Sequence, residues 1–289
     1  MDIEQALEWA SNKISKRLEL DIEILLLEAL NKDRAWLYGH TDYVLEMQEM
    51  AKFKRYINRR ARGEPVAYIL EHKEFYGLDF CVSKNVLIPR PETEMIVEEV
   101  LEKTHKKSNI LLIDIGTGSG CIPISILNKR KIKTIAIDIS GKALQTARRN
   151  ARRYKVDKYI KFVKSDLFQN IPKNVFESEY SKIVLTANLP YLSVRMYKEN
   201  YPGLRFEPKN ALVANKNGLE IYNRLFEQIK ERWTLFSCPV LLLMEIDPRQ
   251  KREITKMITK YLTGVEIEIK KDLTGKNRLI ILNINKALD

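Results

Sequence analysis

The chain contains little cysteine, and its three cysteines, Cys81, Cys121 and Cys238, are scattered over 289 residues. They form no Cys-x-x-Cys pair and no even set, so no disulfide framework is expected and a reducing cytoplasm is favoured. Long apolar runs are also missing: stretches such as "VLLLMEI" at 240–246 have the length of a buried strand and are too short to span a membrane. The acidic, amphipathic N-terminus does not resemble a signal peptide. We therefore expect a cytoplasmic protein without a membrane segment.

Histidine is scarce as well, which argues against a metal site. His40, His72 and His105 lie far apart, and none belongs to a His-Glu-x-x-His motif. The sequence has neither a Walker loop nor a Gly-x-Ser-x-Gly nucleophile elbow. Cys121 follows a glycine-rich loop and is expected to be a small packing residue rather than a nucleophile. No metal is predicted.

The composition is that of an ordinary globular protein with a strong basic excess. Hydrophobic residues make up 45% and charged residues 30% of the chain, and the formal net charge is +12. Such a length is sufficient for two domains. The positive charge fits an acidic or nucleic-acid-bearing partner, but a lysine-rich composition with solvated surfaces explains it equally well.

The hydrophobic pattern divides the chain into three parts. Residues 1–72 show helical periodicity, with an apolar stripe over 14–30 and a second long helix over roughly 43–62. Residues 73–93 alternate apolar and polar side chains and break at Gly77 and at 83–85, which predicts a β-hairpin linker. Residues 94–289 form the third part, in which strands and helices alternate.

That alternation predicts an α/β, Rossmann-like, doubly wound sheet. Apolar strands are expected near 109–115, 133–140, 159–166, 181–188 and 239–246, with helices near 92–103, 121–130, 141–154, 217–233 and 249–262 between and around them. Two further apolar stretches, 265–272 and 277–284, are expected to pair as an antiparallel edge. In such a sheet, ligands bind beyond the carboxyl ends of the strands.

The first candidate binding element is the glycine loop "DIGTGSG" at 114–120, directly after a predicted strand. The residues expected to contact a cofactor are Gly116, Thr117, Gly118, Ser119 and Gly120. Glycines permit unusual backbone angles and let a ligand approach the main chain at a helix N-terminus. A dinucleotide fingerprint would need glycine or alanine at position 121, which is Cys121, so the spacing favours a nucleoside without pyrophosphate, such as S-adenosylmethionine. A plain strand-to-helix turn is the alternative.

Acidic residues end the next two strands. Asp138 follows the strand "KTIAI" and could accept hydrogen bonds from both ribose hydroxyls; it could equally cap the next helix beside Ser140. Asp166 could accept from an adenine amino group while Leu167 and Phe168 wall the ring. A capping turn is the alternative for this segment.

The fourth strand runs into Asn188-Leu189-Pro190-Tyr191. An amide or exocyclic amino nitrogen is a poor nucleophile, and the side-chain oxygen of Asn188 with the carbonyl of Leu189 could accept its two N–H hydrogens. Pro190 would stiffen the turn and Tyr191 would offer a surface for a flat group. The pattern therefore predicts methyl transfer to a planar nitrogen, with an ordinary Asn-Pro loop as the alternative.

Taken together, these motifs resemble the release-factor glutamine N5-methyltransferases, the HemK group of the class I S-adenosylmethionine-dependent methyltransferases. The resemblance covers nearly the whole chain and rests on "GEPVAYILEHKEFYGLDF" (63–80), "VLIPRPETE" (86–94), "DIGTGSG" (114–120), "AIDIS" (136–140), "ANLPY" (187–191), "FEPKNAL" (206–212) and "DLTGKNR" (272–278). The glycine loop is shared by many methyltransferases, whereas "IPRPETE" with the Asn-x-Pro-Tyr and "FEP" elements is far more specific.

The resemblance implies a fold, a reaction and a set of residues. It implies a helical substrate-recognition domain and a hairpin before the catalytic domain, and methylation of the glutamine in the Gly-Gly-Gln loop of class I peptide-chain release factors. By position, 116–120, Asp138, Leu167 and Asn188 would line the cofactor, and 188–191 would hold the glutamine. Pro89, Arg90 and Thr93 would border the same cleft. A monomer that works near the ribosome is expected.

Two positions depart from the family pattern, which usually has Asn-Pro-Pro-Tyr and a glycine after "YIL". Here these positions hold Leu189 and Glu71. The carbonyl of Leu189 survives the change, but the turn loses one rigid φ; Glu71 would be strained if that position has a positive φ.

An rRNA adenine N6-methyltransferase is the main alternative, because Asn-Leu-Pro-Tyr also resembles the motif of the rRNA adenine dimethyltransferases and the net charge suits RNA. Those enzymes generally begin near the glycine loop, whereas more than 100 residues precede Gly116 here. A binding protein that has lost turnover and a dehydrogenase are weaker alternatives.

Overall fold

The computed structural model describes residues 1–15, 18–104, 109–176 and 180–284, and His105 therefore lies outside the described residues. The chain divides into two compact units, Met1–His72 and Lys73–Asp289. No helix among the described residues is long and apolar enough to cross a membrane.

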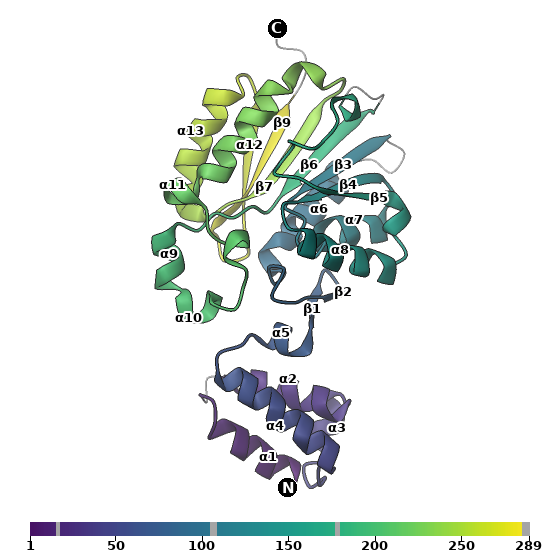
Figure 1. Cartoon of the computed structure of the whole chain (residues 1–289), viewed down its shortest axis with the longest axis vertical. Coiled ribbons are helices and arrows are strands. Elements are labelled where there is room, and N and C mark those ends of the chain that lie inside the picture. The colour runs from purple at the N-terminus through teal and green to yellow at the C-terminus, as the bar shows by residue number, and fades with distance from the viewer. Residues whose placement is uncertain (16–17, 105–108, 177–179, 285–289) are drawn as a thin grey trace. The chain divides into compact units, whose positions relative to one another are not determined.

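The first unit is built from helices, drawn in purple and blue in Figure 1. They are α1 (Ile3–Ser11), α2 (Glu19–Leu30), α3 (Arg34–Gly39), α4 (Met47–Ala61) and α5 (Val66–Leu70). Their apolar faces meet in one core that includes Leu25, Phe53 and Ile57. The small all-helical domain expected from the sequence is thus present.

The two helices expected in this unit are shorter than their apolar patterns. The stripe over 14–30 is helical from Glu19 to Leu30. The helix expected over 43–62 begins at Met47, because Glu46 and Glu49 form a capping box there and the preceding segment bonds to the N-terminus instead. The N–H of Ile3 donates to the carbonyl of Tyr43 at 3.1 Å. Backbone pairing with a distant segment therefore replaces the first helical turn.

The second unit starts with a β-hairpin of β1 (His72–Phe75) and β2 (Leu78–Cys81). Its two turn residues, Tyr76 and Gly77, have φ values of 53° and 70°, as a two-residue type I′ turn requires. The buried side chain of Asn150 accepts from the N–H of Cys81 at 2.8 Å and donates to its carbonyl at 3.0 Å. The hairpin is therefore fastened to the helix that carries Asn150.

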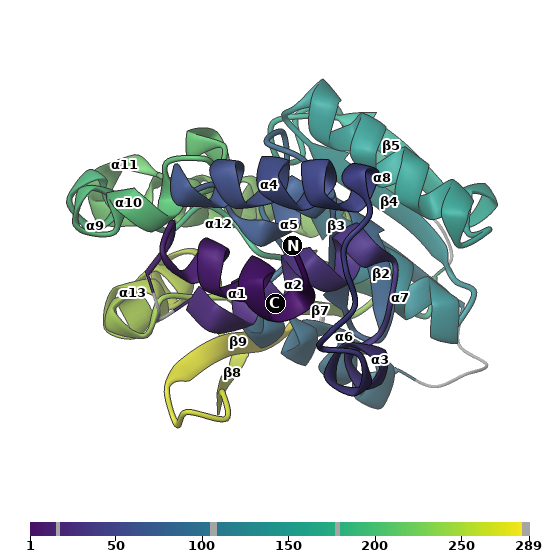
Figure 2. The same cartoon turned by 90° about the horizontal axis from the view of Figure 1, so that it is seen from below.

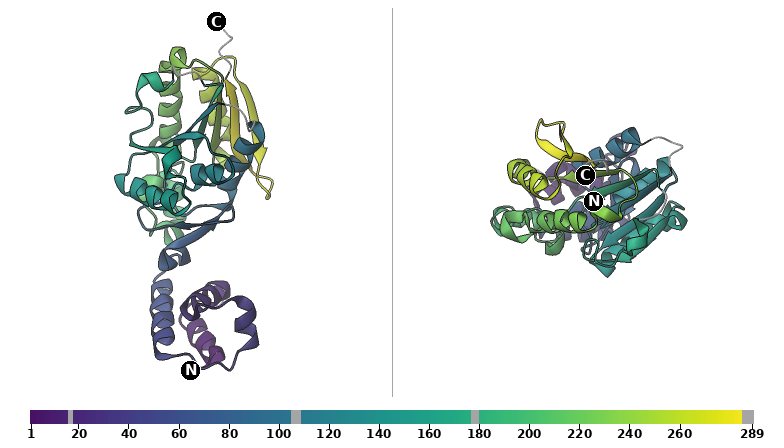
Figure 3. Two further views of the ribbon diagram at one scale, coloured as in Figure 1. Left: turned by 90° about the vertical axis from the view of Figure 1, so that its right-hand side faces the viewer. Right: turned by 90° about the horizontal axis from the view of Figure 1, so that it is seen from above.

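A seven-stranded sheet forms the body of this unit, in the order β5-β4-β3-β6-β7-β9-β8. The strands are β3 (Ile110–Ile115), β4 (Lys133–Asp138), β5 (Ile160–Lys164), β6 (Lys182–Ala187), β7 (Val240–Glu245), β8 (Glu266–Lys271) and β9 (Asn277–Ile284). Strands β3 to β7 pair in parallel, and β9 is antiparallel to both β7 and β8. The expected doubly wound sheet with an antiparallel edge is confirmed; that edge is yellow in Figures 2 and 3.

Helices cover both faces of the sheet. The longer ones are α6 (Glu94–Lys103), α7 (Cys121–Lys129), α8 (Gly141–Arg153), α12 (Glu220–Glu231) and α13 (Lys251–Tyr261). Buried side chains of α6 and α7 pack on one face of the sheet and those of α12 and α13 on the other, which gives two separate apolar cores. Three short helices follow β6. The sequence had shown no pattern at α9 (Val194–Glu199) and α10 (Tyr201–Leu204), and α11 (Asn215–Gly218) overlaps the start of the helix expected near 217–233.

The strand order places the site. After β5 the chain returns to the other side of β3 to form β6, so the direction of winding reverses between β3 and β6. Loops at the carboxyl ends of such strands separate and leave a crevice, which is where open α/β sheets bind ligands.

Candidate active site

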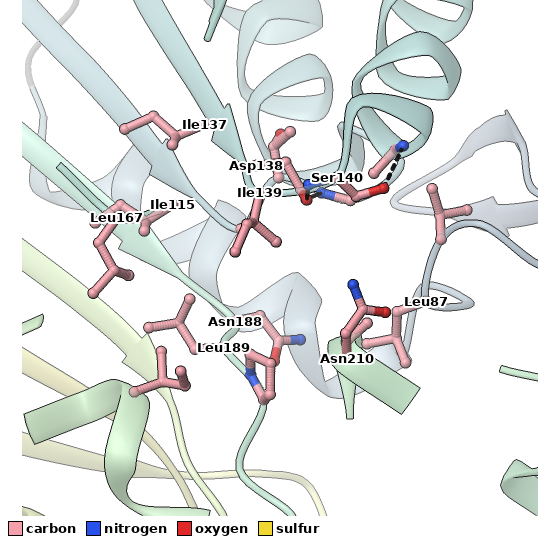
Figure 4. Close-up of a pocket in the computed structure, with 18 of the residues that line it drawn as sticks. Leu87, Ile115, Ile137, Asp138, Ile139, Ser140, Leu167, Asn188, Leu189 and Asn210 are labelled. Atoms are coloured by element: carbon pink, nitrogen blue, oxygen red, sulfur yellow. Dashed lines mark hydrogen bonds between the residues drawn. The ribbon is translucent and has the colours of Figure 1, made fainter. Parts of the chain in front are cut away.

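A cavity of about 550 Å³ lies at the carboxyl ends of β3 to β6. This volume is within the usual range of small-molecule sites. The lining residues come from the segments 85–93, 115–122, 137–143, 165–167, 188–190, 210–215 and 220–224. Figure 4 shows Asp138, Ile139 and Ser140 on one side of this cavity, with Asn188 and Leu189 across from them.

Most residues predicted for the site line this cavity, and three do not. Those that line it are Pro89, Arg90, Thr93, Gly116, Thr117, Gly118, Ser119, Asp138, Asp166, Leu167, Asn188, Leu189 and Pro190. Gly120, Phe168 and Tyr191 are not among the lining residues, and each packs against other parts of the second unit.

The glycine loop is held open by its backbone. The N–H groups of Gly116 and Thr117 both donate to the carbonyl of Ile137, at 2.9 and 2.8 Å. Gly116 and Gly118 have φ values of 74° and 55°, which L side chains rarely adopt. A Cβ on Gly118 would meet only the carbonyl oxygen of Gly116, at 3.9 Å, so the glycine leaves this part of the wall open.

Gly120 serves packing rather than the cavity. Its φ is 80°, and a Cβ there would lie 2.9 Å from the Cδ1 of Ile124 and 3.2 Å from the Cβ of Ala147. The third glycine therefore lets α8 approach the loop, and the sequence prediction that it contacts the cofactor has no support in this geometry.

Asp138 ends β4 beside the loop. Its carboxylate accepts from the N–H of Gly118 at 2.9 Å and from the N–H of Ser140 at 2.8 Å. Burial raises the pKa of Asp138, although both backbone N–H groups favour its charged form. A carboxylate has about four acceptor positions, so two remain for the hydroxyls of a ribose. Ser140, whose side chain accepts from the N–H of Ala143, is the cap of α8, which removes the capping alternative for Asp138.

The segment after β5 is only partly as predicted. Asp166 lines the cavity but pairs with Arg224 of α12, which lines it as well. Leu167 also lines the cavity, with a φ of 51°. Phe168 is fully buried and packs edge-on against Phe176, so the expectation that it walls a bound ring is wrong. Ile139, which is 56% exposed, is an apolar side chain that does line the cavity.

Asn188, at the end of β6, belongs to a network of buried polar groups. Its Nδ2 donates to the Oγ1 of Thr93 at 2.9 Å and to the Oε2 of Glu245 at 3.0 Å. The hydroxyl of Thr93 donates to the same Oε2 at 2.6 Å. Burial raises the pKa of Glu245. The network leaves the Oδ1 of Asn188 for the cavity that this residue lines.

The rest of the Asn-Leu-Pro-Tyr turn is held by packing and hydrogen bonds on the side away from the cavity. The Cδ2 of Leu189 lies 3.1 Å from the position of a Cβ on Gly116, so the leucine packs directly on the glycine loop. The hydroxyl of Tyr191 donates to the Oε1 of Glu245 at 3.3 Å, and burial raises its pKa. A Cβ on Gly218 would lie 2.0 Å from the carbonyl oxygen of Tyr191, so only glycine fits there. Tyr191 thus anchors the turn in the core.

An ion pair joins the two most specific sequence elements at the rim. Arg90 of "IPRPETE" pairs with Glu207 of "FEPKNAL", whose side chain is 2% exposed. The other oxygen of Glu207 accepts from the N–H of Ile88 at 3.1 Å. Two loops that border the cavity are therefore tied to each other.

Sequence reasoning missed Arg224, Glu207 and Glu245 as members of the site. Glu245 carried a usable signal, because it is an isolated acid at the carboxyl end of a continuous apolar strand. Arg224 carried none, because it is one charged residue among many in a helix, and the signal of Glu207 was only its place in "FEPKNAL", one of the segments that carry the resemblance. Among the described residues, no group of three or more histidine, cysteine or acidic side chains could hold a metal ion.

The site suits a nucleoside cofactor next to a planar nitrogen. An acid with free acceptor positions, an open glycine loop and apolar side chains such as Ile139 and Leu167 fit a ribose, a backbone-contacting tail and a flat ring. Asn188 lies across the same cavity. Acceptor groups beside a cofactor site can orient an N–H-bearing acceptor for group transfer.

Comparisons with known proteins find family matches in both units of the chain. The family model of the PrmC N-terminal domain matches residues 5–70, and that of a methyltransferase domain matches residues 106–263. The release factor glutamine methyltransferase of Bacillus subtilis is 33% identical over 290 residues, 98% of each chain. That of Leptospira interrogans is 38% identical and covers 95% of this chain and 94% of its own.

Solved structures show the fold alone. The hMettl16 catalytic domain in complex with MAT2A 3′UTR hairpin 1 matches with a TM-score of 0.56 at 14% identity, over 98% of this chain and 92% of that one. The same domain in complex with hairpin 6 gives 0.54 at 17% identity, over 81% and 83%.

Proposed function

The chain belongs to the release factor glutamine methyltransferases, and we propose that it transfers a methyl group from S-adenosylmethionine to the side-chain amide nitrogen, N5, of the glutamine in the Gly-Gly-Gln loop of class I peptide-chain release factors. The observation that carries the proposal is the amide of Asn188, whose Nδ2 is bonded inward and whose oxygen is left for the cavity beside the glycine loop.

Different residues around the cavity are assigned to the cofactor and to the glutamine. Asp138, 116–119 and Leu167 would hold the cofactor, and Asp166 would accept from its adenine through the carboxylate oxygen that does not pair with Arg224. When bound, S-adenosylmethionine supplies an electrophilic methyl group on a sulfonium. Asn188 would also border the cofactor, because it lines the same cavity.

Catalysis in this scheme is mainly positioning. The Oδ1 of Asn188 and the carbonyl of Leu189 accept the two N–H hydrogens of the glutamine amide, which turns its nitrogen toward the methyl group. Positive charge would develop on the amide nitrogen as it takes the methyl group, and both acceptors would stabilise that charge. The amide then loses one N–H proton, which restores a neutral product. Pro190 stiffens the turn that carries both acceptors.

Recognition of the protein substrate extends beyond the cavity. We assign it to the helical residues 1–72 and to the rim of Pro89, Arg90 and Thr93 around the glutamine. We also propose that the chain acts as a monomer in the cytoplasm, close to the ribosome where release factors work. Its net charge of +12 supports encounter with such acidic assemblies.

A methyl-transfer assay tests the reaction directly. The chain is incubated with labelled S-adenosylmethionine and either a purified class I release factor or bulk rRNA, and the label is mapped by mass spectrometry. Label on the Gly-Gly-Gln glutamine is expected. Label on adenine of the RNA instead would refute the proposal and revive the adenine N6-methyltransferase, which relatives of the whole chain do not favour.

The variant Asn188→Ala tests the mechanism. It removes one of the two acceptors, so turnover should fall by about 10²–10³-fold or more. Cofactor affinity measured by calorimetry should change little, because 116–119 and Asp138 remain. An equal loss of turnover and cofactor binding would mean that Asn188 acts on the cofactor and not on the glutamine.

A further inference from the structure

Glu245 lies at the carboxyl end of β7, and its side chain is buried at the back of the site. The residue is 2% exposed. Its carboxylate accepts hydrogen bonds from three groups: Thr93 at 2.6 Å, Asn188 at 3.0 Å and Tyr191 at 3.3 Å. Its carbonyl accepts from the hydroxyl of Tyr222 at 2.6 Å. A carboxylate in such a place is costly unless its acceptors are used, and here both oxygens are bonded.

The bonding pattern determines which way the amide of Asn188 faces. An ionised carboxylate only accepts, so Glu245 requires a donor from Asn188, and that donor is Nδ2. The single proton of the Thr93 hydroxyl is already given to Glu245, so Thr93 can only accept from Asn188. Both contacts therefore require the NH₂ group, and a flipped amide would place an oxygen against two acceptors.

We infer that Glu245 is a positioning residue that, together with Thr93, locks the amide of Asn188 with its oxygen toward the methyl acceptor. Glu245 does not line the cavity and acts only through its neighbours. Without this lock, the two orientations of the amide become comparable in energy. The wrong orientation presents N–H groups to the N–H groups of the substrate. The inference rests on the proposed function for its kinetic test and on the network alone for its structural test.

An exchange of donor and acceptor tests the lock. In Asn188→Asp, two carboxylates face each other, and turnover should fall by at least about 10²-fold. Glu245→Gln alone keeps an acceptor toward Asn188 and should lose less than about tenfold. In the double variant, the Nε2 of Gln at 245 donates to Asp at 188, the hydroxyl of Thr93 reverses, and an oxygen again faces the cavity. Turnover should recover at least tenfold over Asn188→Asp.

A purely structural role would not give this recovery. Glu99→Gln is the matched control, because Glu99 is also buried and charged but pairs with Lys270 of β8 and does not line the cavity. It should leave the ratio of kcat to KM unchanged. For Asn188→Asp, the lock predicts a loss in kcat. The KM for the release factor and the Kd for S-adenosylmethionine should stay within about threefold of the wild-type values. A double variant no better than Asn188→Asp, with both proteins folded, would overturn the inference.

A second measurement does not depend on the substrate. In chain labelled with ¹⁵N-asparagine, the Nδ2 hydrogens of Asn188 should exchange slowly with solvent, and their signals are assigned by their loss in Asn188→Ala. Glu245→Leu should expose them to fast exchange. If the Nδ2 hydrogens of Asn188 exchange as fast in the wild type as in Glu245→Leu, the lock does not exist, whatever the methyl-transfer assay shows. If they are slow but no release factor is methylated, the proposed function fails and the lock stands.

Discussion

The ion pair between Arg90 and Glu207 offers a quantitative test of how the rim of the site is held. Replacing Arg90 by Met keeps most of the side-chain stem but removes the charge. Glu207, 2% exposed, then loses its charged partner and keeps the hydrogen bond from the N–H of Ile88. Breaking a buried pair in this way costs roughly 3–5 kcal/mol of unfolding free energy. Because Arg90 is itself 35% exposed, water can reach the gap, and we expect about 2–3 kcal/mol.

Replacing the other member of the pair, Glu207, by Gln removes the charge but keeps the shape of the side chain. Glu207→Gln still accepts from Ile88 and leaves Arg90 near solvent, so its cost should be about 1 kcal/mol. The double variant no longer has an unpaired buried charge, and its cost should fall below that of Arg90→Met alone. The coupling energy of the cycle should therefore be about 1–2 kcal/mol.

Urea unfolding of the second unit measures these values. The chain has three tryptophans, of which Trp9 and Trp36 lie in the first unit and Trp233 in the second. With the first two replaced by Phe, fluorescence reports the second unit alone. Arg195→Met, which breaks an exposed pair with Glu199, is the control and should cost less than about 0.5 kcal/mol. A cost for Arg90→Met no larger than this control would refute the reasoning.

Three further predictions concern single residues. Glu71 is exposed with a φ of 63°, so Glu71→Gly should raise the urea midpoint of the first unit by the equivalent of about 1 kcal/mol, and Glu71→Ala should not. Gly120→Ala should destabilise the second unit by at least about 2 kcal/mol, because φ is 80° and the new methyl meets α7 and α8; Gly203→Ala, which meets nothing within 4 Å, should be neutral in the same urea titration. Burial raises the pKa of Asp114 from 3.8 to about 6, although Thr186 donates to it. The folded state then binds more protons between these values, so this group lowers stability as pH rises from about 4 to 6. In Asp114→Asn, that part of the slope of melting temperature against pH should disappear; an unchanged slope would contradict the assignment.

At position 71, the structure meets the condition under which the sequence predicted strain. Strain was expected there only if the backbone had a positive φ, and Glu71 ends α5 in the left-handed conformation. The departure at Leu189 has a different outcome. Its side chain is 4% exposed and packs on Gly116, so it fills space between the glycine loop and the Asn-Leu-Pro-Tyr turn. The residue therefore contributes packing that the sequence pattern did not indicate.

Local pattern was sufficient for the fold. Continuous apolar strands such as 110–115 and 240–245, alternating with amphipathic helices, predict a parallel sheet because both faces of each strand must be buried. The glycine loop, Asp138 and Asn188 could be predicted as neighbours for a related reason, since each directly follows a strand and parallel strands end at one edge. Short helices such as α9 could not, because helices of six residues have too few turns to show a period.

What the sequence by itself determined is therefore the order of the elements and the residues at the strand ends, because both depend on neighbours within a few positions. Only the tertiary structure decided how those residues work. Asn188 and Glu245 are 57 residues apart, and Arg90 and Glu207 are 117 apart, yet each pair shares hydrogen bonds. It also showed that Gly120 and Tyr191 face the core. Such contacts depend on how distant segments pack, and no local period or spacing records them.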